Sequence, residues 1–459
     1  MTSKAGRVLF LGLAAIALLY AVLASLRTVS DPDTFWQLAT GRWVAHHHHV
    51  FSTDVFSYTA QGQPWIYPAG SGVLLYVVYL MGGYALLSWL AAAACAGTIA
   101  LLLRRGSAVS AAIAILAIPL MAGRTAPRAE MFTLVLFAAY LSILWQNYQS
   151  SRAPLWLLPL LMMAWVNFHL GFVAGLALMV GFVGIDVLEL LFPGRRRVEA
   201  VQRLKRAWPW FVAAALATLV NPWGWGIYTA LARQNRVMAV HSGWIAEWGS
   251  VPLNWTAGAA IFSLTSTKGT FYQLLLVAVA AAIVALWQRQ FGAAMFLLGA
   301  VYLGARHTRM DALSACVVIV VGGPFLFSAV QQARSRLANP RTRLFLAVTV
   351  AAMLSALVCV RLVNAVTNRN HNPWTFGTGL GWQFPERAAE FIERENLPGE
   401  VFNTYNEGGY LVWKFGFRRR DYFDGRAIPF GPESFSRQSE LLQTSLDSER
   451  WRQEAARYN

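Results

Sequence analysis

Two aspartates separated by a single proline, Asp31-Pro32-Asp33, follow the first apolar segment of the chain, and Asp54 lies further along the same polar stretch. Carboxylates can hold a divalent cation such as Mg²⁺, Mn²⁺ or Ca²⁺, or act as a general base. An aspartate before a helix can instead cap its free backbone amides, and this is the alternative for Asp33. We take Asp31, Asp33 and Asp54 as candidate catalytic residues, with Asp31 and Asp33 as candidate metal ligands.

Basic residues form a second candidate group, in two short segments between apolar stretches. A charge placed at membrane depth is costly and is usually paired or functional. Arginine offers forked N–H donors that suit phosphate oxygens, so these segments predict a phosphate site. The alternative is that the arginines pair with Glu130 and Asp311. The candidate phosphate-binding residues are Arg124, Arg128, Arg306, His307 and Arg309.

The composition is that of a polytopic α-helical membrane protein. Of 459 residues, 56% are hydrophobic and 13% are charged. The formal charge is +16, but residues 364–459 contain 12 Lys/Arg against 13 Asp/Glu, so the excess lies in residues 1–363. Short arginine-rich loops mark the cytoplasmic side of a membrane. The charge therefore does not indicate nucleic-acid binding.

Apolar runs approaching roughly 20 residues predict about eleven transmembrane helices. We expect the first to be an uncleaved anchor, because it is longer than the apolar part of a signal peptide, about 7–15 residues. The basic loops then fall on one side, which places the N-terminus in the cytoplasm. The expected spans lie near residues 8–26, 84–103, 109–123, 130–148, 155–168, 170–192, 208–221, 271–287, 291–305, 312–331 and 344–363.

An odd number of spans places three long segments outside the cytoplasm. We expect a transmembrane domain over residues 1–363, with outer loops at 27–83 and 222–270, and an extracytoplasmic domain over 364–459. The apolar stretch 70–81 is short, so we expect it to lie along the membrane surface or to re-enter.

The segment 364–459 is expected to form a small α/β domain. Residues 384–392 have the pattern of an amphipathic helix, and residues 401–405 that of a strand. A turn is expected at Glu407-Gly408-Gly409. Helix and strand in succession indicate an α/β arrangement.

Four consecutive histidines, residues 46–49, resemble a metal cluster. Consecutive side chains on an extended segment point in opposite directions, and no second metal-binding motif accompanies them. This favours a solvated loop over metal binding.

The whole organisation resembles the GT-C superclass of membrane glycosyltransferases, which use polyprenyl-phosphate sugars. Residues 30–67 and 401–426 carry most of the likeness. The resemblance implies that Asp31 or Asp33 is the catalytic base or metal ligand, with Asp54 as a second acid.

Two shorter segments resemble the oligosaccharyltransferase branch of that superclass. Ile245-Ala246-Glu247 is similar to the glutamate motif of its long outer loop. The run Asn403 to Tyr410, followed by Asp424, is similar to its acceptor-reading Trp-Trp-Asp-Tyr-Gly segment, although the paired tryptophans are absent. The acceptor-side candidates implied are Glu247, Asn406, Glu407 and Asp424.

Together these features predict a multi-pass glycosyltransferase of the bacterial plasma membrane. It would move a sugar from a polyprenyl-phosphate-linked donor to an extracytoplasmic glycan, lipid or protein, with inversion at the sugar carbon and with a divalent metal. The alternatives are a protein that binds, flips or assembles lipid-linked glycans, and a GT-C-like protein that has lost catalysis.

Overall fold

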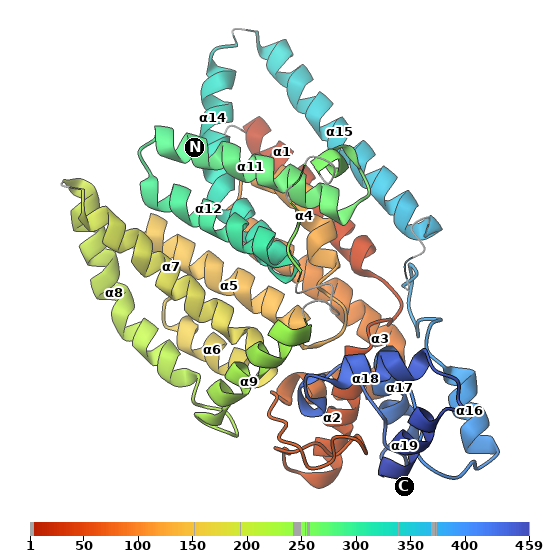
Figure 1. The fold of residues 1–459 in the computed structure, drawn as a ribbon. Helices are drawn as coiled ribbons and strands as arrows, with labels where there is room; N and C mark the ends of the chain where they lie inside the picture. Colours follow the sequence, from red (N-terminus) through yellow and green to blue (C-terminus); the bar gives the residue numbers. More distant parts are fainter. Residues whose placement is uncertain are drawn as a thin grey trace.

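Helices make up most of the chain, as Figure 1 shows for the computed structural model. The structure describes residues 4–150, 152–192, 194–241, 249–252, 254, 258–337, 339–368, 372 and 374–458. Among these, seven helical segments are long and apolar enough to cross a membrane. Such a chain is a multi-pass membrane protein, because a helix satisfies its own backbone groups in lipid. The seven are Lys4–Ser25, Gly70–Leu103, Ala129–Gln149, Leu170–Leu190, Thr267–Trp287, Thr308–Ser335 and Pro340–Thr367.

The helices run from α1 to α15 through the bundle and from α16 to α19 in the C-terminal segment. Those of the first part are α1 (Lys4–Ser25), α2 (Asp33–His47), α3 (Gly70–Leu103), α4 (Ala108–Ala122), α5 (Ala129–Gln149), α6 (Leu157–Phe168), η1 (Leu170–Phe172), α7 (Val173–Leu190), α8 (Arg195–Ala217), α9 (Gly226–His241), η3 (Ala259–Phe262), α11 (Thr267–Trp287), α12 (Phe291–Arg306), η4 (Thr308–Met310), α13 (Asp311–Val317), η5 (Val318–Gly322), α14 (Gly323–Ser335) and α15 (Pro340–Thr367). Those of the second part are α16 (Glu386–Arg394), α17 (Tyr405–Phe415), η6 (Ile428–Phe430), α18 (Ser434–Leu442) and α19 (Glu449–Tyr458).

The expected eleven spans are only partly found. Seven coincide with the long apolar helices, and three correspond to the shorter apolar helices α4, α6 and α12. The expected span 208–221 overlaps the second half of α8, whose first half is rich in arginine. The expected domain boundary at residue 363 lies inside α15, and the division into domains stays a prediction.

Residues 70–81, expected to lie along the membrane surface or to re-enter, form the first half of α3, and their place in the membrane stays a prediction. A kink at Gly82 and Gly83 joins this half to the second half, and Gly83 has φ 61° and ψ −154°. Residues with a Cβ rarely adopt such a conformation, so glycine allows one helix to change direction here.

Helix α2, which begins at Asp33, packs closely on the first half of α3. A Cβ on Gly41 would lie 2.1 Å from the carbonyl oxygen of Gly72, so the two backbones touch. This contact fixes where α2 presents its first turn.

The C-terminal segment is helical and not α/β, because no strand occurs among its described residues. The expected helix is confirmed as α16, but the expected strand 401–405 is not found: residues 401–404 lie in neither a helix nor a strand, and Tyr405 begins α17. A capping box starts α17: the Glu407 carboxylate accepts from the Thr404 backbone N–H at 3.1 Å and from its hydroxyl at 2.9 Å. Gly408 and Gly409, expected in a turn, lie inside this helix.

The C-terminal helices and α2 lie side by side at one end of the bundle in Figure 1. Isolated β-bridges join Arg27 to Phe376 and Val29 to Leu380, and a third joins Ser57 to Asp421. The segment after α1 and the loop between α2 and α3, residues 48–69, are thus both attached to the C-terminal segment.

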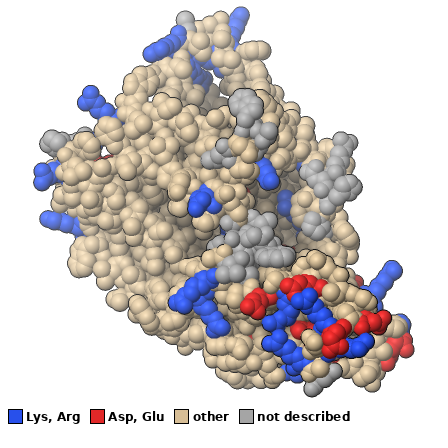
Figure 2. Space-filling model, viewed as in Figure 1, with Lys and Arg blue, Asp and Glu red and all other residues tan. Residues whose placement is uncertain are grey.

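Surface charge is distributed unevenly. On the face in Figure 2, Asp and Glu gather over the C-terminal helices, whereas the bundle is mostly neutral with Lys and Arg near its edges. Large apolar side chains such as Leu19, Val180 and Phe345 are exposed on the bundle. This is the surface expected of helices that face lipid.

Candidate active site

Three carboxylates and two arginines from separate parts of the chain form one ion-paired cluster, here called the acid cluster. Arg128 Nη1 lies 3.2 Å from Asp31 Oδ2 and 3.1 Å from Asp33 Oδ2, and its Nη2 pairs with Glu130 Oε2. Arg309 Nε lies 3.1 Å from Glu130 Oε1. Asp33 and Glu130 each stand in the first turn of a helix, where the helix dipole favours negative charge.

The two aspartates have different local partners. Asp31 Oδ1 accepts from the backbone N–H of Asp33 at 3.0 Å, so Asp31 satisfies an amide at the start of α2. Asp33 Oδ1 accepts from Trp36 Nε1 at 2.9 Å. No side-chain cap is formed at Pro32, the N-cap of α2. The carboxylate of Asp33 is therefore directed at Arg128 and Trp36 and does not cap the helix.

A cavity of about 910 Å³ adjoins the acid cluster. Residues of α5, α7, α9, α12 and α13 line it, most of them Leu, Phe, Ala, Met and Val. Polar groups gather among the lining residues Arg124, Glu130, His169, His307 and Arg309. The cavity thus combines an apolar wall with a cluster of cationic and imidazole side chains.

The five candidate phosphate-binding residues are not all brought together. Arg124, His307 and Arg309 line the cavity, whereas Arg128 lies in the acid cluster and Arg306 is exposed at the end of α12. Arg124 Nε lies 3.6 Å from Asp311 Oδ1, and its Nη2 donates to the Thr308 carbonyl at 3.0 Å. The pairs with Glu130 and Asp311 therefore exist alongside the cavity.

His307 supplies a polar atom that the surrounding chain leaves unused. Its Nδ1 is buried and has no hydrogen-bond partner among the described residues, and the same is true of Oε1 of Gln234. Both residues line the cavity. Because buried polar atoms are usually satisfied, a polar group of a ligand is a natural partner for them.

A neutral histidine on the cavity wall was not among the sequence-predicted residues. His169 Nδ1 accepts from the Gly171 backbone N–H at 3.1 Å. Thr133 Oγ1 accepts from Trp165 Nε1 at 2.8 Å and lies 2.7 Å from His169 Nδ1, so its own hydroxyl donates to that nitrogen. These contacts assign the proton of His169 to Nε2. The signal in the sequence was the presence of two polar residues, Asn167 and His169, at the end of an apolar helix.

Glu130 was expected only as an ion-pair partner, yet it links Arg128 to the cavity residue Arg309. The signal was present in the sequence, because an acid directly after an arginine hairpin starts an apolar helix. It becomes a candidate functional residue because it lies in both the acid cluster and the cavity wall.

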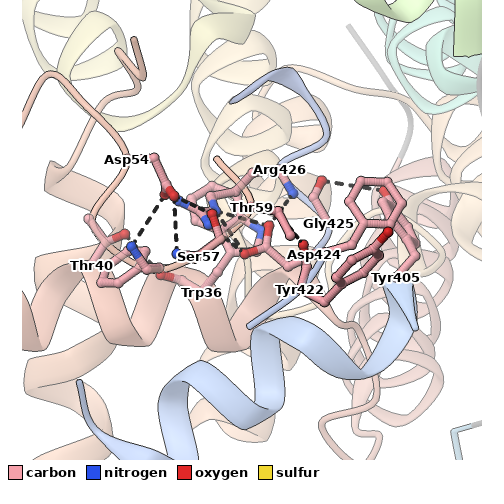
Figure 3. Close-up of polar contacts among 12 residues, drawn as sticks. Trp36, Thr40, Asp54, Ser57, Thr59, Tyr405, Tyr422, Asp424, Gly425 and Arg426 are labelled. Carbon is pink, nitrogen blue, oxygen red and sulfur yellow. Dashed lines mark hydrogen bonds and ion pairs between the residues drawn. The ribbon is translucent and has the colours of Figure 1, made fainter. Parts of the chain in front are cut away.

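Two glycines of the C-terminal segment, Gly425 and Gly409, pack closely against the residues that begin α2. A Cβ on Gly425 would lie 2.2 Å from Asp33 Oδ1, and one on Gly409 would lie 2.7 Å from the Pro32 carbonyl oxygen. Tyr405 donates its hydroxyl to the Gly425 carbonyl at 3.3 Å, as Figure 3 shows. Burial raises the pKa of Tyr405 well above its usual value, with Asp33 adding to the effect, so the hydroxyl stays protonated.

Asp54 lies in a second, fully buried cluster (Figure 3). Arg426 pairs with Asp54 and with Asp424, whose Oδ2 lies 2.7 Å from Arg426 Nη2. Asp54 Oδ2 also accepts from the Ser57 backbone N–H at 3.0 Å. This arrangement joins the loop between α2 and α3 to the C-terminal segment, and a catalytic role for Asp54 stays a prediction.

The acceptor-side candidates have diverse surroundings. Glu407 caps α17, Asn406 is exposed on that helix, and Asp424 is held by Arg426. Glu247 lies outside the described residues. Their role in binding an acceptor stays a prediction.

The histidine run ends α2. His47 stacks on Trp43 with ring centroids 4.1 Å apart, and all four histidines are exposed. In the part of the chain that the structure describes, no group of three or more His, Cys, Asp or Glu could hold a metal ion.

The acid cluster contains the two predicted metal ligands, Asp31 and Asp33. Carboxylate oxygens are suitable donors for Mg²⁺, Mn²⁺ or Ca²⁺. However, the guanidinium of Arg128 occupies the space between Asp31, Asp33 and Glu130. As arranged, these residues do not fit a divalent ion.

Solved structures of an archaeal enzyme resemble this one. Oligosaccharyltransferase AglB from Archaeoglobus fulgidus, in complex with an inhibitory peptide and a dolichol-phosphate, matches with a TM-score of 0.54 at 12% identity, over 93% of this chain and 65% of that one. At this identity the likeness shows a shared fold, so the chain has the fold of this oligosaccharyltransferase. The predicted resemblance is thus confirmed at the level of fold, and the chain spans about 65% of the length of AglB.

Two further structures match less well. The Archaeoglobus fulgidus oligosaccharyltransferase tethered with an acceptor peptide containing the NVT sequon has a TM-score of 0.49 at 11% identity, over 91% of this chain and 64% of that one. The apo form has a TM-score of 0.48 at 12% identity, over 91% and 65%. A scan against protein-family models and a search of curated proteins find no match.

Proposed function

We propose that the chain is a glycosyltransferase that moves a sugar from a polyprenyl-phosphate-linked donor to an extracytoplasmic acceptor. The observation that carries this proposal is the large apolar cavity whose cationic residues adjoin a cluster of carboxylates. A polyprenyl chain requires an apolar wall, its phosphate requires cations, and transfer requires a base. The fold shared with AglB, solved with a dolichol-phosphate, supports the same proposal.

In the proposed complex, the lipid tail lies along the apolar wall and the phosphate meets Arg124, Arg309 and His307. These residues stabilise the negative charge that develops on the phosphate as it leaves. His307 Nδ1 and Gln234 Oε1 offer unsatisfied polar atoms in the described region for the donor.

The reaction is a direct displacement at the sugar carbon. Asp33, or Asp31, takes the proton from the acceptor hydroxyl. The acceptor oxygen forms a bond to the anomeric carbon as the bond from that carbon to the phosphate oxygen breaks. Polyprenyl phosphate leaves with the bonding electrons, and attack from the opposite side inverts the anomeric configuration.

The acceptor is proposed to be a glycan, a lipid or a protein. The solved AglB complex contains an inhibitory peptide, which makes a peptide acceptor one of the classes to test. Asn406, Glu407, Asp424 and Glu247 remain the residues proposed to face it. The proposed orientation has the N-terminus in the cytoplasm and the C-terminal segment outside, in a bacterial plasma membrane.

The test begins with ligand binding. Undecaprenyl phosphate is titrated into the full chain in nanodiscs, with Arg309→Ala, Arg124→Ala and the exposed-site control Arg387→Ala. Wild type and the control should bind it, and the two cavity variants should bind at least about tenfold more weakly, because a hydrogen bond to a charged group contributes about 1.5–3 kcal/mol. Equal binding by all four proteins would contradict the assignment of the cavity.

Turnover is measured next with a panel of undecaprenyl-phosphate sugars and peptide, glycan and lipid acceptors. Asp31→Asn and Asp33→Asn, singly and together, should reduce transfer while binding persists. Unchanged transfer in the double variant would show that neither aspartate is the base. Binding without transfer by wild type would favour the alternative of a protein that binds, flips or assembles lipid-linked glycans.

A further inference from the structure

Every carboxylate oxygen of the acid cluster already accepts from a donor of the chain. Asp31 offers Oδ2 to Arg128 and Oδ1 to the Asp33 N–H. Asp33 offers Oδ2 to Arg128 and Oδ1 to Trp36. Glu130 offers Oε2 to Arg128 and Oε1 to Arg309. A metal ion would have to displace several of these donors at once.

Arg128 differs from the other arginines of the site because it does not line the cavity. Arg124 and Arg309 line the cavity, whereas Arg128 does not, and its side chain is only 10% exposed. Its Nη1 is shared between Asp31 and Asp33 within 3.2 Å. A guanidinium is permanently charged and planar, so it can bridge several carboxylates in one fixed geometry.

Electrostatics oppose a second cation at this position. A divalent ion among the same carboxylates would lie beside the guanidinium of Arg128 and close to that of Arg309. Like charges at such separations repel strongly in a partly buried site. The carboxylates of the cluster can therefore bind either the guanidinium of Arg128 or a metal ion, but not both at once.

We propose that Arg128 is the built-in cation of the acid cluster and that sugar transfer by this chain needs no divalent metal. This inference rests on the proposed function. Arg128 acts as a positioning residue: its Nη1 lies within 3.2 Å of both Asp31 Oδ2 and Asp33 Oδ2 and holds the two carboxylates together, so that one of them can accept a proton. Arg124 and Arg309, which line the cavity, are the arginines proposed to meet the donor phosphate.

The first experiment measures Mn²⁺ binding to the full chain in detergent by electron paramagnetic resonance. Wild type should bind Mn²⁺ no more than about twofold better than Asp33→Asn. Arg128→Gln removes the cation while leaving the carboxylates, so its Mn²⁺ affinity should rise at least about tenfold. That gain should disappear in the double variant Arg128→Gln/Asp33→Asn, and Arg387→Gln should behave like wild type.

Several results would overturn the inference. Wild type could bind Mn²⁺ tenfold more tightly than Asp33→Asn, or a folded Arg128→Gln could gain no Mn²⁺ affinity. Thermal unfolding establishes whether Arg128→Gln folds. If it does not, the comparison of wild type with Asp33→Asn decides the question without it.

The second experiment measures transfer in EDTA and in added Mn²⁺. Wild type should transfer at the same rate within about twofold in both, and Arg128→Lys should retain more activity than Arg128→Gln because it keeps a positive charge. Loss of wild-type transfer in EDTA with recovery in Mn²⁺ would overturn the inference. Absence of transfer in every condition would contradict the proposed function, while the Mn²⁺ binding data would still decide the role of Arg128.

Discussion

Glu130 connects the two halves of the candidate site at the scale of single residues. It holds Arg128 with one carboxylate oxygen and Arg309 with the other, and the Arg309 contact is 3.1 Å long. Its side chain is only 9% exposed, so solvent does little to replace either contact. The position of Arg309, which is proposed to meet the donor phosphate, therefore depends on this acid.

Glu130→Gln should reduce sugar transfer by about 10–100-fold, because a hydrogen bond to a charged group contributes about 1.5–3 kcal/mol. The substitution keeps the size of the side chain and removes its charge. Undecaprenyl-phosphate binding should weaken as well, since Arg309 loses its ionic partner. The same substitution at the exposed Glu386 of α16 should leave both measurements unchanged. Full activity of Glu130→Gln would exclude this coupling.

Ionising the buried carboxyl of Asp421 destabilises the fold, and the extent of this ionisation depends on pH. Both of its carboxylate oxygens are buried without a hydrogen-bond partner in the described residues. Burial, with Asp424 adding to the effect, raises the pKa of Asp421 well above its usual value. Between the unfolded and folded pKa values the folded chain binds more protons, so the free energy of unfolding falls as pH rises through that window.

Asp421→Asn should therefore raise the unfolding temperature at pH 8 and have a smaller effect at pH 5, where the native carboxyl is more protonated. The neutral amide can donate to Asp424 at either pH. Burying an unsatisfied polar group costs about 1–3 kcal/mol, which sets the scale of the gain. Thermal unfolding in detergent at both pH values measures it, with the exposed Asp447→Asn as the control. A variant less stable than wild type at pH 8 would contradict the assignment.

At the scale of elements, the turn around Gly425 and the start of α17 fix the first turn of α2. Gly425 and Gly409 let two backbone segments approach Asp33 and Pro32 more closely than any side chain would allow. The acid cluster is thus shaped partly by residues about 390 positions later in the chain.

Gly425→Ala should displace the Asp33 carboxylate, because the new Cβ would lie 2.2 Å from Oδ1. Transfer should fall by up to about 100-fold, since misplacing a reacting group by roughly 1 Å has an effect of that size. Gly97→Ala in α3 is the matched control, because its Cβ would meet no atom within 4 Å. Activity equal to that of the control would show that Asp33 is not positioned by this turn.

The sequence predicts the apolar helices well, because a long hydrophobic run has few alternatives to a membrane helix. It predicts the Asp31 and Asp33 pair and the arginines by residue type alone. It does not predict that Arg128 lies in the acid cluster and not in the cavity wall. That placement depends on ion pairs with Asp31, Asp33 and Glu130, which come from separate parts of the chain. The strand expected at 401–405 does not form. The capping box of Thr404 and Glu407 starts α17 at Tyr405, and Gly408 and Gly409 allow this helix to pack closely on neighbouring backbone.

At the scale of the whole molecule, a buried ion-paired cluster joins the loop between α2 and α3 to the C-terminal segment. Arg426 pairs with Asp54 from the loop and Asp424 from its own turn, with all three side chains fully buried. Removing one partner of such a buried cluster leaves uncompensated charge, which costs about 3–5 kcal/mol.

Arg426→Gln should therefore detach the C-terminal segment from the loop. Limited proteolysis should cut the variant faster between α15 and α16, while the bundle stays intact. Arg437→Gln is the control, because its partner Glu433 is 82% exposed and surface pairs contribute about 0–1 kcal/mol. Equal cleavage rates for the two variants would show that the buried cluster does not hold the segment in place.

The contact between Asp54 and Arg426 also has a consequence for how the protein is made. These residues are 372 positions apart. At about 5–20 residues per second of synthesis, Asp54 waits roughly 20–75 s for its partner to emerge. During that interval Gly425 is also absent, so the acid cluster is not yet enclosed. A ribosome-bound chain that lacks its last segment should therefore show none of the proposed sugar transfer.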